Sequence, residues 1–280
     1  MLGKTPRRMQ LAREWPKLLH ASISAENGWA IVLPFCETLR SAFDAMCPVV
    51  VRLRESKAGR CVTFLATLDD SVRDRILHWH ATVGQYVALR DCLLASFALD
   101  YDREGGAPNR VHTRIGELRL RAKPYDGAPS EDTRMAADQL IQECVSFLRS
   151  MTCYEKAEAV VAMPPSKPDK LFDLPRYLAN GIAREIGKAD LSHHVVTVKE
   201  RPPLKDTSLA EKLGAIQGTI SIDRGPFQGR TILLIDDLYQ SGISMNYVAM
   251  ELLQAGAKAV LGLACEKTCR NDDNVGHTRD

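Results

Sequence analysis

The sequence predicts an α/β protein in which a domain with a central parallel β-sheet follows a smaller α+β domain. In the second half of the chain, short apolar, β-branched runs alternate with apolar residues at helical spacing, the pattern of parallel βαβ units. Residues 102–110 form a polar stretch that contains glycine and proline and has no apolar period, which indicates a domain boundary. The 280 residues suffice for two modest cores. We therefore expect domains at residues 1–110 and 111–280.

The region before this boundary contains recognisable elements but no functional motif. Residues 30–35, 48–53 and 61–68 are apolar and β-branched and predict strands, with a turn near Gly59 between the last two. Residues 70–99 carry apolar side chains at helical spacing and predict one long helix. The role of residues 1–110 is not indicated by any of these patterns.

Beyond the boundary the predicted elements alternate. The order is a basic segment, a helix, a buried strand, a proline-rich loop, a second helix and a short strand, at residues 115–125, 130–151, 157–163, 164–170, 174–186 and 195–198. The basic segment holds Arg119, Arg121 and Lys123, and the second helix tolerates Pro175 in its first turn.

The clearest motif lies at residues 231–244, where four features follow one another. An apolar, branched run at residues 232–235 has the length of a strand buried on both faces. Two carboxylates, Asp236 and Asp237, come next. A short loop of small residues then leads into a helical stripe that ends at Gly256. The order is strand, acidic pair, loop and helix.

This order is typical of a site for a sugar phosphate. Ligands of open α/β sheets bind beyond the carboxyl ends of the strands, and a loop entering a helix offers N–H groups and a positive dipole end to a phosphate. Gly242 lets the backbone approach closely, and Ser241 and Ser244 add hydroxyl donors. Asp236 and Asp237 suit neighbouring sugar hydroxyls or a hydrated divalent metal. A phosphate beside a diol indicates a ribose 5-phosphate.

Residues 232–244 resemble the phosphoribosyl-pyrophosphate (PRPP) signature of the type I phosphoribosyltransferases. The resemblance implies a three-layer α/β domain, and it implies that Asp236 and Asp237 hold the ribose 2- and 3-hydroxyls. It also implies that the 5-phosphate is bound by Tyr239, Gln240, Ser241, Gly242, Ile243 and Ser244. The alternatives are the first strand of a receiver domain, for which too few residues follow, and an ordinary buried strand with a solvated turn.

The resemblance covers residues 115–270 and is closest to the ComF-like (competence protein F) branch. Residues 160–170 resemble the pyrophosphate loop, parts of residues 201–218 resemble the mobile segment over the active site, and Lys123-Pro-Tyr125 resembles the Lys-Tyr at the start of the transferase domain. The implied pyrophosphate contacts are Pro165, Ser166, Lys167 and Lys170. The implied cations of the mobile segment are Lys199, Arg201, Lys205 and Lys212.

These implied roles describe an enzyme. Asp236, Asp237 and Lys167 are the expected catalytic residues, because charge develops on the leaving pyrophosphate and requires cationic and metal help. Mg²⁺ is the expected cofactor, bound mainly by ligand oxygens, with Asp236 and Asp237 as the nearest protein groups. The expected substrate is PRPP or a related ribose phosphate, and the acceptor is not identified.

Three departures from the family bear on the acceptor. Gln240 stands where purine-salvage members carry an acid that acts as a base, and an amide cannot take that proton at neutral pH. Ala215 replaces the usual asparagine of the ComF-like branch, and its N-terminal zinc ribbon is missing. The acceptor surface is therefore expected to be this chain's own. The alternative function is a non-catalytic PRPP- or nucleotide-sensing module linked to DNA uptake or DNA metabolism.

Composition excludes several other classes. A formal net charge of +2 gives no electrostatic basis for general nucleic-acid or membrane binding. There is no apolar run of transmembrane length and no signal core near the start, so we expect a cytoplasmic protein. The eight cysteines are scattered and predict buried thiols rather than disulfides or a metal site. Many members of the fold form dimers, so the resemblance also suggests a homodimer.

Overall fold

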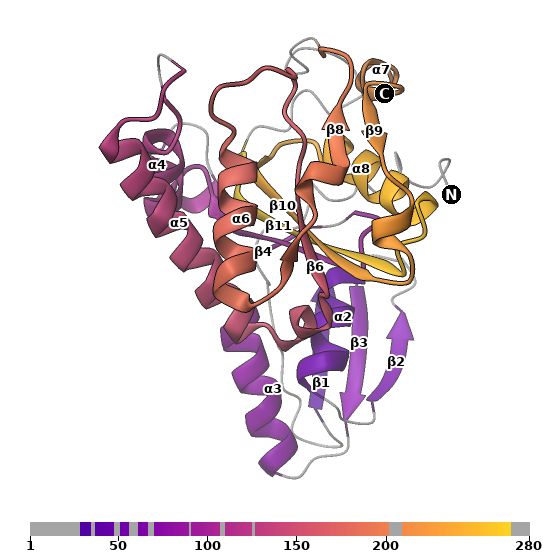
Figure 1. Cartoon of the computed structure of the whole chain (residues 1–280). Helices are drawn as coiled ribbons and strands as arrows, with labels where there is room; N and C mark the ends of the chain where they lie inside the picture. The colour runs from indigo at the N-terminus through magenta and orange to yellow at the C-terminus, as the bar shows by residue number, and fades with distance from the viewer. Residues whose placement is uncertain are drawn as a thin grey trace, which may run out of the picture.

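The computed structural model describes residues 29–34, 37–47, 51–55, 61–66, 70–89, 91–106, 110–124, 127–201 and 209–269. At its centre is a six-stranded sheet with the order β4-β5-β11-β10-β6-β7 (Figure 1). Neighbouring strands of this sheet are parallel except at the edge, where β4 is antiparallel to β5. The predicted α/β architecture with a central, mostly parallel sheet is confirmed. The strands are β4 (Val87–Ala88), β5 (Ala95–Tyr101), β6 (Ala159–Ala162), β7 (Ala189–Asp190), β10 (Thr231–Tyr239) and β11 (Ala259–Lys267).

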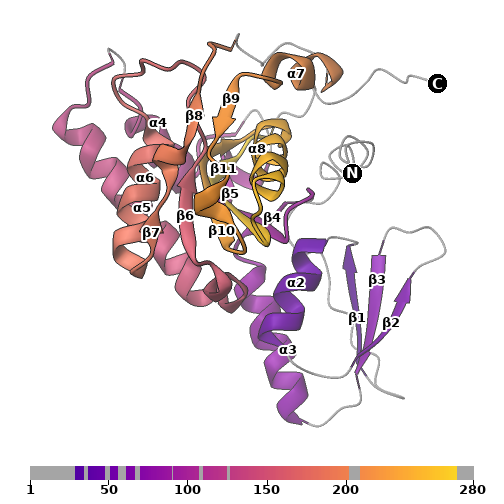
Figure 2. The same ribbon diagram turned by 45° about the vertical axis from the view of Figure 1, so that its right-hand side comes forward.

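Helices cover both faces of this sheet, which gives the expected three layers (Figure 2). Leu233 and Ile235 of β10 belong to a core that they share with the α4, α5 and α6 layer. Ile232 and Leu234, the alternate residues of the same strand, belong to a second core on the α8 side. This alternation follows from the two-residue period of a strand. The helices are α4 (Arg114–Arg121), α5 (Glu131–Ser150), α6 (Leu174–Ile186) and α8 (Ile243–Gln254).

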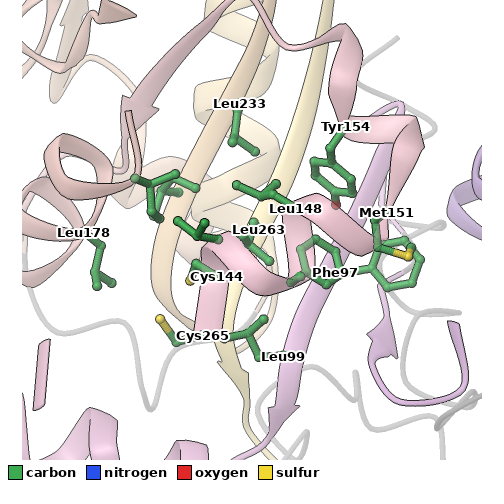
Figure 3. Packing of buried hydrophobic residues seen from close by; sticks show 14 of the residues in the cluster. Phe97, Leu99, Cys144, Leu148, Met151, Tyr154, Leu178, Leu233, Leu263 and Cys265 are labelled. Carbon is green, nitrogen blue, oxygen red and sulfur yellow. The ribbon is translucent and has the colours of Figure 1, made fainter. Parts of the chain in front are cut away.

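In the core on the α5 side, aromatic rings such as Phe97 and Tyr154 pack among leucine, methionine and cysteine side chains (Figure 3). The Phe147 ring lies 5.7 Å from Phe97 of β5 and 5.1 Å from Tyr154, centroid to centroid. The Tyr154 hydroxyl donates to the carbonyl of Gly262 at 2.6 Å, which satisfies its one polar group within the core. Cys144 and Cys265 are buried in the same core, and the six cysteines whose side chains are described are all free thiols.

The N-terminal part of the chain contributes a small sheet and two helices. The sheet is antiparallel with the order β1-β3-β2, and its strands match the three predicted positions to within a few residues. Helix α2 was not predicted. Its Phe43 side chain is buried against Trp79 of α3 at 5.1 Å and joins the core of the central domain. These elements are β1 (Trp29–Pro34), α2 (Glu37–Met46), β2 (Val51–Glu55), β3 (Cys61–Ala66) and α3 (Asp70–Val83).

The prediction of one helix over residues 70–99 is wrong beyond Val83. The helix α3 ends there, and residues 95–101 instead form β5, which pairs in parallel with β11. The first five residues of β5 are all buried. Because apolar side chains occupy both faces of such a strand, their spacing also fits a helix, so periodicity alone cannot separate the two.

The central sheet therefore draws on both sides of the boundary expected at residues 102–110. Strands β4 and β5 precede it, while β6, β7, β10 and β11 follow it. Strand β11, which had not been predicted, lies between β5 and β10 and so joins the two parts of the chain.

A two-stranded antiparallel sheet, β8 with β9, stands apart from the central sheet, with α7 between its strands in sequence (Figure 1). The predicted strand at residues 195–198 is present, but in this small sheet. No described helix has the length and apolarity needed to cross a membrane. These elements are β8 (Val195–Thr197), α7 (Leu209–Ile216) and β9 (Ile220–Ile222), and the short 3-10 helices are η3 (Glu104–Gly106), η4 (Thr152–Lys156), η5 (Ser192–His194) and η6 (Gly225–Phe227).

Candidate functional site

The acidic pair lies within β10 rather than after it. The strand continues through Asp236 and Asp237 to Tyr239, so the two carboxylates leave opposite faces of the sheet. Asp237 faces the α4 layer, where its carboxylate contacts Arg119 and Lys123. Asp236 is only partly buried, and it interacts electrostatically with Lys123 and Arg201 but forms no ion pair with either of these described residues. The two acids therefore occupy different electrostatic environments.

Asp237 is the centre of a buried ionic network. Its Oδ2 accepts from Arg119 Nε at 2.9 Å and from Lys123 Nζ at 2.8 Å, and Arg119 Nη1 also lies 3.2 Å from Glu266 Oε1. The Arg119, Asp237 and Glu266 side chains are 10%, 11% and 3% exposed, whereas Lys123 is 42% exposed. We refer to these four residues as the Asp237 network.

Asp236, Asp237 and Glu266, the three acids at this end of the sheet, have pKa values that their surroundings shift in different directions. Burial alone would raise the pKa of Asp237, but Lys123 and Arg119 outweigh it and hold that pKa well below its usual range. Burial and the adjacent Asp237 carboxylate raise the pKa of Asp236 far above that of an exposed acid. Burial also raises the pKa of Glu266, to about 7, against the opposing effect of Arg119.

Sequence reasoning placed Arg119 in a basic segment and Lys123 both in that segment and in a family resemblance, but it paired neither with an acid. Arg119 lies on helix α4, and Lys123 follows just after the helix, which ends at Arg121. Their acidic partner was not predictable, because Arg119 and Asp237 are 118 positions apart in the sequence.

The predicted phosphate loop joins β10 to α8 with a tight turn at Gly242. This residue has φ 77°, and a Cβ added to it would lie 2.1 Å from the Tyr239 hydroxyl oxygen, so only glycine fits. The Tyr239 ring is 2% exposed and its hydroxyl donates to Asp91 Oδ2 at 3.3 Å. Tyr239 can therefore face a ligand only through its backbone.

The start of α8 is open to an anion. The N-cap residue Gly242 has no side chain with which to cap this helix, and the Ile243 N–H makes only a long hydrogen bond, 3.5 Å to Ser241 Oγ. Gln240, Ser241 and Ser244 are partly exposed beside it. The arrangement can hold a phosphate with backbone amides, hydroxyls and the positive end of the helix dipole.

Residues from the N-terminal half of the chain brace this loop. Asn246 of α8 donates through Nδ2 to the Gly242 carbonyl at 2.7 Å, and its Oδ1 accepts from the Cys92 N–H at 2.9 Å. Asp91 accepts from Tyr239 beneath the same turn. Nothing in residues 91–92 indicated this role in the sequence.

The predicted pyrophosphate loop lies between β6 and α6, with its two lysines at the surface. Lys167 Nζ is 2.8 Å from Glu200 Oε1, with both side chains largely exposed, and Lys170 Nζ is 3.4 Å from Asp173 Oδ1. Asp173 also caps α6 by accepting from the N–H of Arg176. Pro165 is partly buried and Ser166 exposed. The loop is accessible, but its cations have acidic partners in this structure.

Two of the cations assigned to the mobile segment are buried instead. Arg201 is 6% exposed, and its Nη2 donates to the carbonyls of Pro164 at 2.9 Å and Pro165 at 2.8 Å. It therefore braces the pyrophosphate loop rather than extending over it. Lys212 of α7 is 1% exposed. Lys199 is exposed, and Lys205 lies outside the described residues.

Comparisons with known proteins add similarities of fold. No family model matches the chain, and no curated protein matches it. Solved structures that resemble it include an adenine phosphoribosyltransferase, with 15% identity over 59% of this chain and 96% of that one and a TM-score of 0.36. Another is an adenine phosphoribosyltransferase from Leishmania donovani, with 13% identity, coverages of 64% and 80% and a TM-score of 0.34.

A hypoxanthine phosphoribosyltransferase from Trypanosoma cruzi matches with 12% identity over 61% of this chain and 75% of that one, at a TM-score of 0.33. At identities and TM-scores this low, these similarities leave the function to be argued from the site itself.

Proposed function

We propose that this protein binds Mg²⁺-PRPP and transfers its ribose 5-phosphate to an acceptor, with release of pyrophosphate. The observation that carries the proposal is the unit formed by β10, the Gly242 turn and α8. It places two acids in different environments directly before an uncapped helix N-terminus at the carboxyl end of a central strand. A sugar phosphate is the ligand class that needs both features at this spacing.

The 5-phosphate binds at the Gly242 turn. Backbone N–H groups at the start of α8 and the hydroxyls of Ser241 and Ser244 donate to its oxygens. Gln240 adds an amide donor. The carbonyl of Gly242 is directed away from this role, because it already accepts from Asn246.

The ribose hydroxyls bind at Asp236 and Asp237. Asp237 is fixed as a carboxylate by its two cationic neighbours, both on Oδ2. Asp236 is partly exposed, so it is the acid that can approach a hydrated Mg²⁺, whose charge would favour the ionised form that burial and the adjacent Asp237 disfavour. This donor set fits a metal held mainly by ligand oxygens, and no group of three or more metal-binding side chains occurs among the described residues. When bound, Mg²⁺ would offset the charge that develops on pyrophosphate.

The leaving pyrophosphate faces the loop at residues 164–170. Ser166 and Lys167 are exposed there, and the pair between Lys167 and Glu200 is a surface contact that contributes little to stability. Lys167 can therefore exchange its carboxylate partner for a phosphate oxygen, with Lys170 beside it. The hydrogen bond that Arg201 donates to the Pro165 carbonyl orients this loop.

The acceptor stays unidentified. Gln240 cannot act as a base, so an acceptor that must lose a proton in the reaction would need another group or water. We assign the acceptor surface to residues 1–110, of which residues 91–92 already contact α8. A ComF-like affiliation, a cytoplasmic location and a homodimer belong to this proposal and rest on the sequence resemblance.

One observation favours a second candidate, a non-catalytic sensor of PRPP or a nucleotide. The loop acid is absent at Gln240, while the sugar-phosphate features beside it are intact. A sensor would bind PRPP, change its affinity for a partner and release no pyrophosphate.

The test is calorimetric titration of PRPP with and without Mg²⁺, together with pyrophosphate release on a panel of nucleobases. We expect Mg²⁺-dependent binding that weakens about 10- to 100-fold in Asp236→Asn, because a charge-assisted hydrogen bond is lost. The double variant with Asp237→Asn should bind more weakly still. Asp132→Asn, at an exposed position on α5, serves as the matched control. Unchanged PRPP affinity in a folded double variant would refute the assignment of the acids.

A further inference from the structure

Lys123 has a position that the proposed function does not yet use. We infer that Lys123 is a further ligand-binding residue, whose ammonium donates to the pyrophosphate of bound PRPP while it stays beside Asp237. This inference rests on the proposed binding of PRPP. It extends the site to a residue just after α4, to which the family resemblance had assigned no ligand contact.

The first reason is that Lys123 is the exposed one of the two cations on Asp237. Arg119 contacts the same carboxylate oxygen from a buried position and also contacts Glu266, so its guanidinium is enclosed between two acids. Lys123 contacts Oδ2 from a side chain that is 42% exposed. Lys123 is therefore the cation of the network that a ligand in solvent can reach.

The second reason is that the ammonium keeps donors for a ligand. A lysine has three N–H donors, and Lys123 uses one on Asp237 among its contacts with described residues. Its exposed fraction places part of the side chain in solvent at the edge of the acidic pair. The charge of Lys123 also lowers the pKa of Asp236, against the stronger effect of burial.

The third reason is that a residue close to Lys123 in the sequence contacts the pyrophosphate loop. A Cβ added to Gly127 would be 3.5 Å from Leu171 Cδ1, and Leu171 directly follows Lys170 of that loop. Lys170 contacts Asp173, and the charge of Asp237 contributes to the raised pKa of Asp173. The pyrophosphate loop is thus linked to Asp237, the acid that Lys123 contacts.

The chemistry of PRPP makes this the position where a cation is useful. Its pyrophosphate is attached to C1, and the 2-hydroxyl is on the adjacent carbon, so a group that binds the hydroxyls lies next to the pyrophosphate oxygens. During transfer, the bond from C1 to oxygen breaks and its electron pair stays on pyrophosphate. The acceptor's lone pair forms the new bond to C1, and any proton of the acceptor passes to solvent. A fixed cation beside Asp237 stabilises the growing negative charge.

The test compares Lys123→Gln with Arg121→Gln. Arg121 is the last residue of α4, two positions before Lys123, and it pairs with Asp132 at the surface, so its loss removes an equal charge away from the site. Each protein is titrated with Mg²⁺-PRPP, Mg²⁺-pyrophosphate and ribose 5-phosphate. We expect Lys123→Gln to bind PRPP and pyrophosphate about 10- to 100-fold more weakly, with ribose 5-phosphate changed less than about threefold. Arg121→Gln should bind all three like the wild type.

Three results overturn the inference in distinguishable ways. If folded Lys123→Gln binds PRPP as the wild type does, the inference fails and the proposed function stands. If PRPP and ribose 5-phosphate weaken equally, Lys123 acts only by positioning Asp237. If the wild type binds no PRPP, both the proposed function and the inference about Lys123 are wrong.

A measurement on the wild-type protein keeps the inference testable should the variant not fold. Mg²⁺-pyrophosphate is expected to protect Lys123 from acetylation by an amine reagent, read by mass spectrometry, whereas ribose 5-phosphate leaves it reactive. Equal reactivity of Lys123 with and without saturating pyrophosphate would overturn the pyrophosphate contact.

Discussion

Replacement of Arg119 by methionine tests the Asp237 network most directly. Methionine keeps much of the apolar length of the side chain but removes the cation that connects Asp237 with Glu266. Removal of one partner from a buried ion pair costs about 3–5 kcal/mol, because the other charge is left buried. Asp237 would retain its contact with Lys123. The lost stability would therefore come mainly from the buried Glu266 carboxylate, whose Oε2 already has no partner among the described residues. Glu266 can take up a proton, which limits the cost, so we expect a loss near 3 kcal/mol.

Urea unfolding followed by circular dichroism measures this loss as a shift of the midpoint at constant slope. Arg114→Met is the matched control, because Arg114 lies on the same helix and pairs with Glu143 at the surface, 66% exposed. We expect it to cost less than about 1 kcal/mol. The double variant Arg119→Met with Glu266→Gln should recover part of the loss, since it removes the stranded carboxylate. If Arg119→Met costs no more than Arg114→Met, the network is not a buried, stabilising one and the description of the site is wrong.

Two further variants test the loop and the titration of the site. Gly242→Ala should destabilise the protein by on the order of 2 kcal/mol more than Gly187→Ala does. Both glycines have positive φ, but only at Gly242 would the new Cβ collide with another side chain, that of Tyr239. Equal losses of stability in urea unfolding would contradict this packing. Burial raises the pKa of Glu266 to about 7, so the folded state holds a proton that the unfolded state has released, and stability should fall as pH rises from about 4.5 to about 7. Glu266→Gln should reduce that fall in stability by up to roughly 3 kcal/mol. The control Glu117→Gln, at an exposed position, should leave the fall unchanged. If the wild type and Glu266→Gln give the same profile of unfolding free energy against pH, Glu266 does not titrate in this range.

Sequence reasoning worked best where an element and its signals are contiguous in the chain. The helix Leu174–Ile186 was predicted with its observed bounds: Pro175 lies in its first turn as expected, and Gly187 ends it in the left-handed conformation. The strand, turn and helix from Thr231 onward also follow the predicted order, although the acidic pair lies inside the strand rather than after it. Here local propensity, turn chemistry and burial all indicate the same structure.

Sequence reasoning was less successful where one spacing of apolar residues fits both a helix and a strand, and where it could not show burial. Residues 95–101 fit a helical period, and only their position between β4 and β11 shows that they form a strand. Arg201 looked like a mobile cation, since a sequence does not show how deeply a charged side chain is buried. In the structure, Arg201 is buried and donates hydrogen bonds to the carbonyls of Pro164 and Pro165.

The sequence by itself determined the succession of strand, acidic pair, turn and helix on which the proposed sugar-phosphate site rests, because those residues are neighbours in the chain. Only the tertiary structure decided the state of each acid. Asp236 and Asp237 are identical in kind and adjacent in sequence, yet the alternation of β10 brings only Asp237 into contact with Arg119 and Lys123. Their pKa values move in opposite directions because helix α4, folded from a segment far away in the chain, packs on one face of the sheet and not on the other.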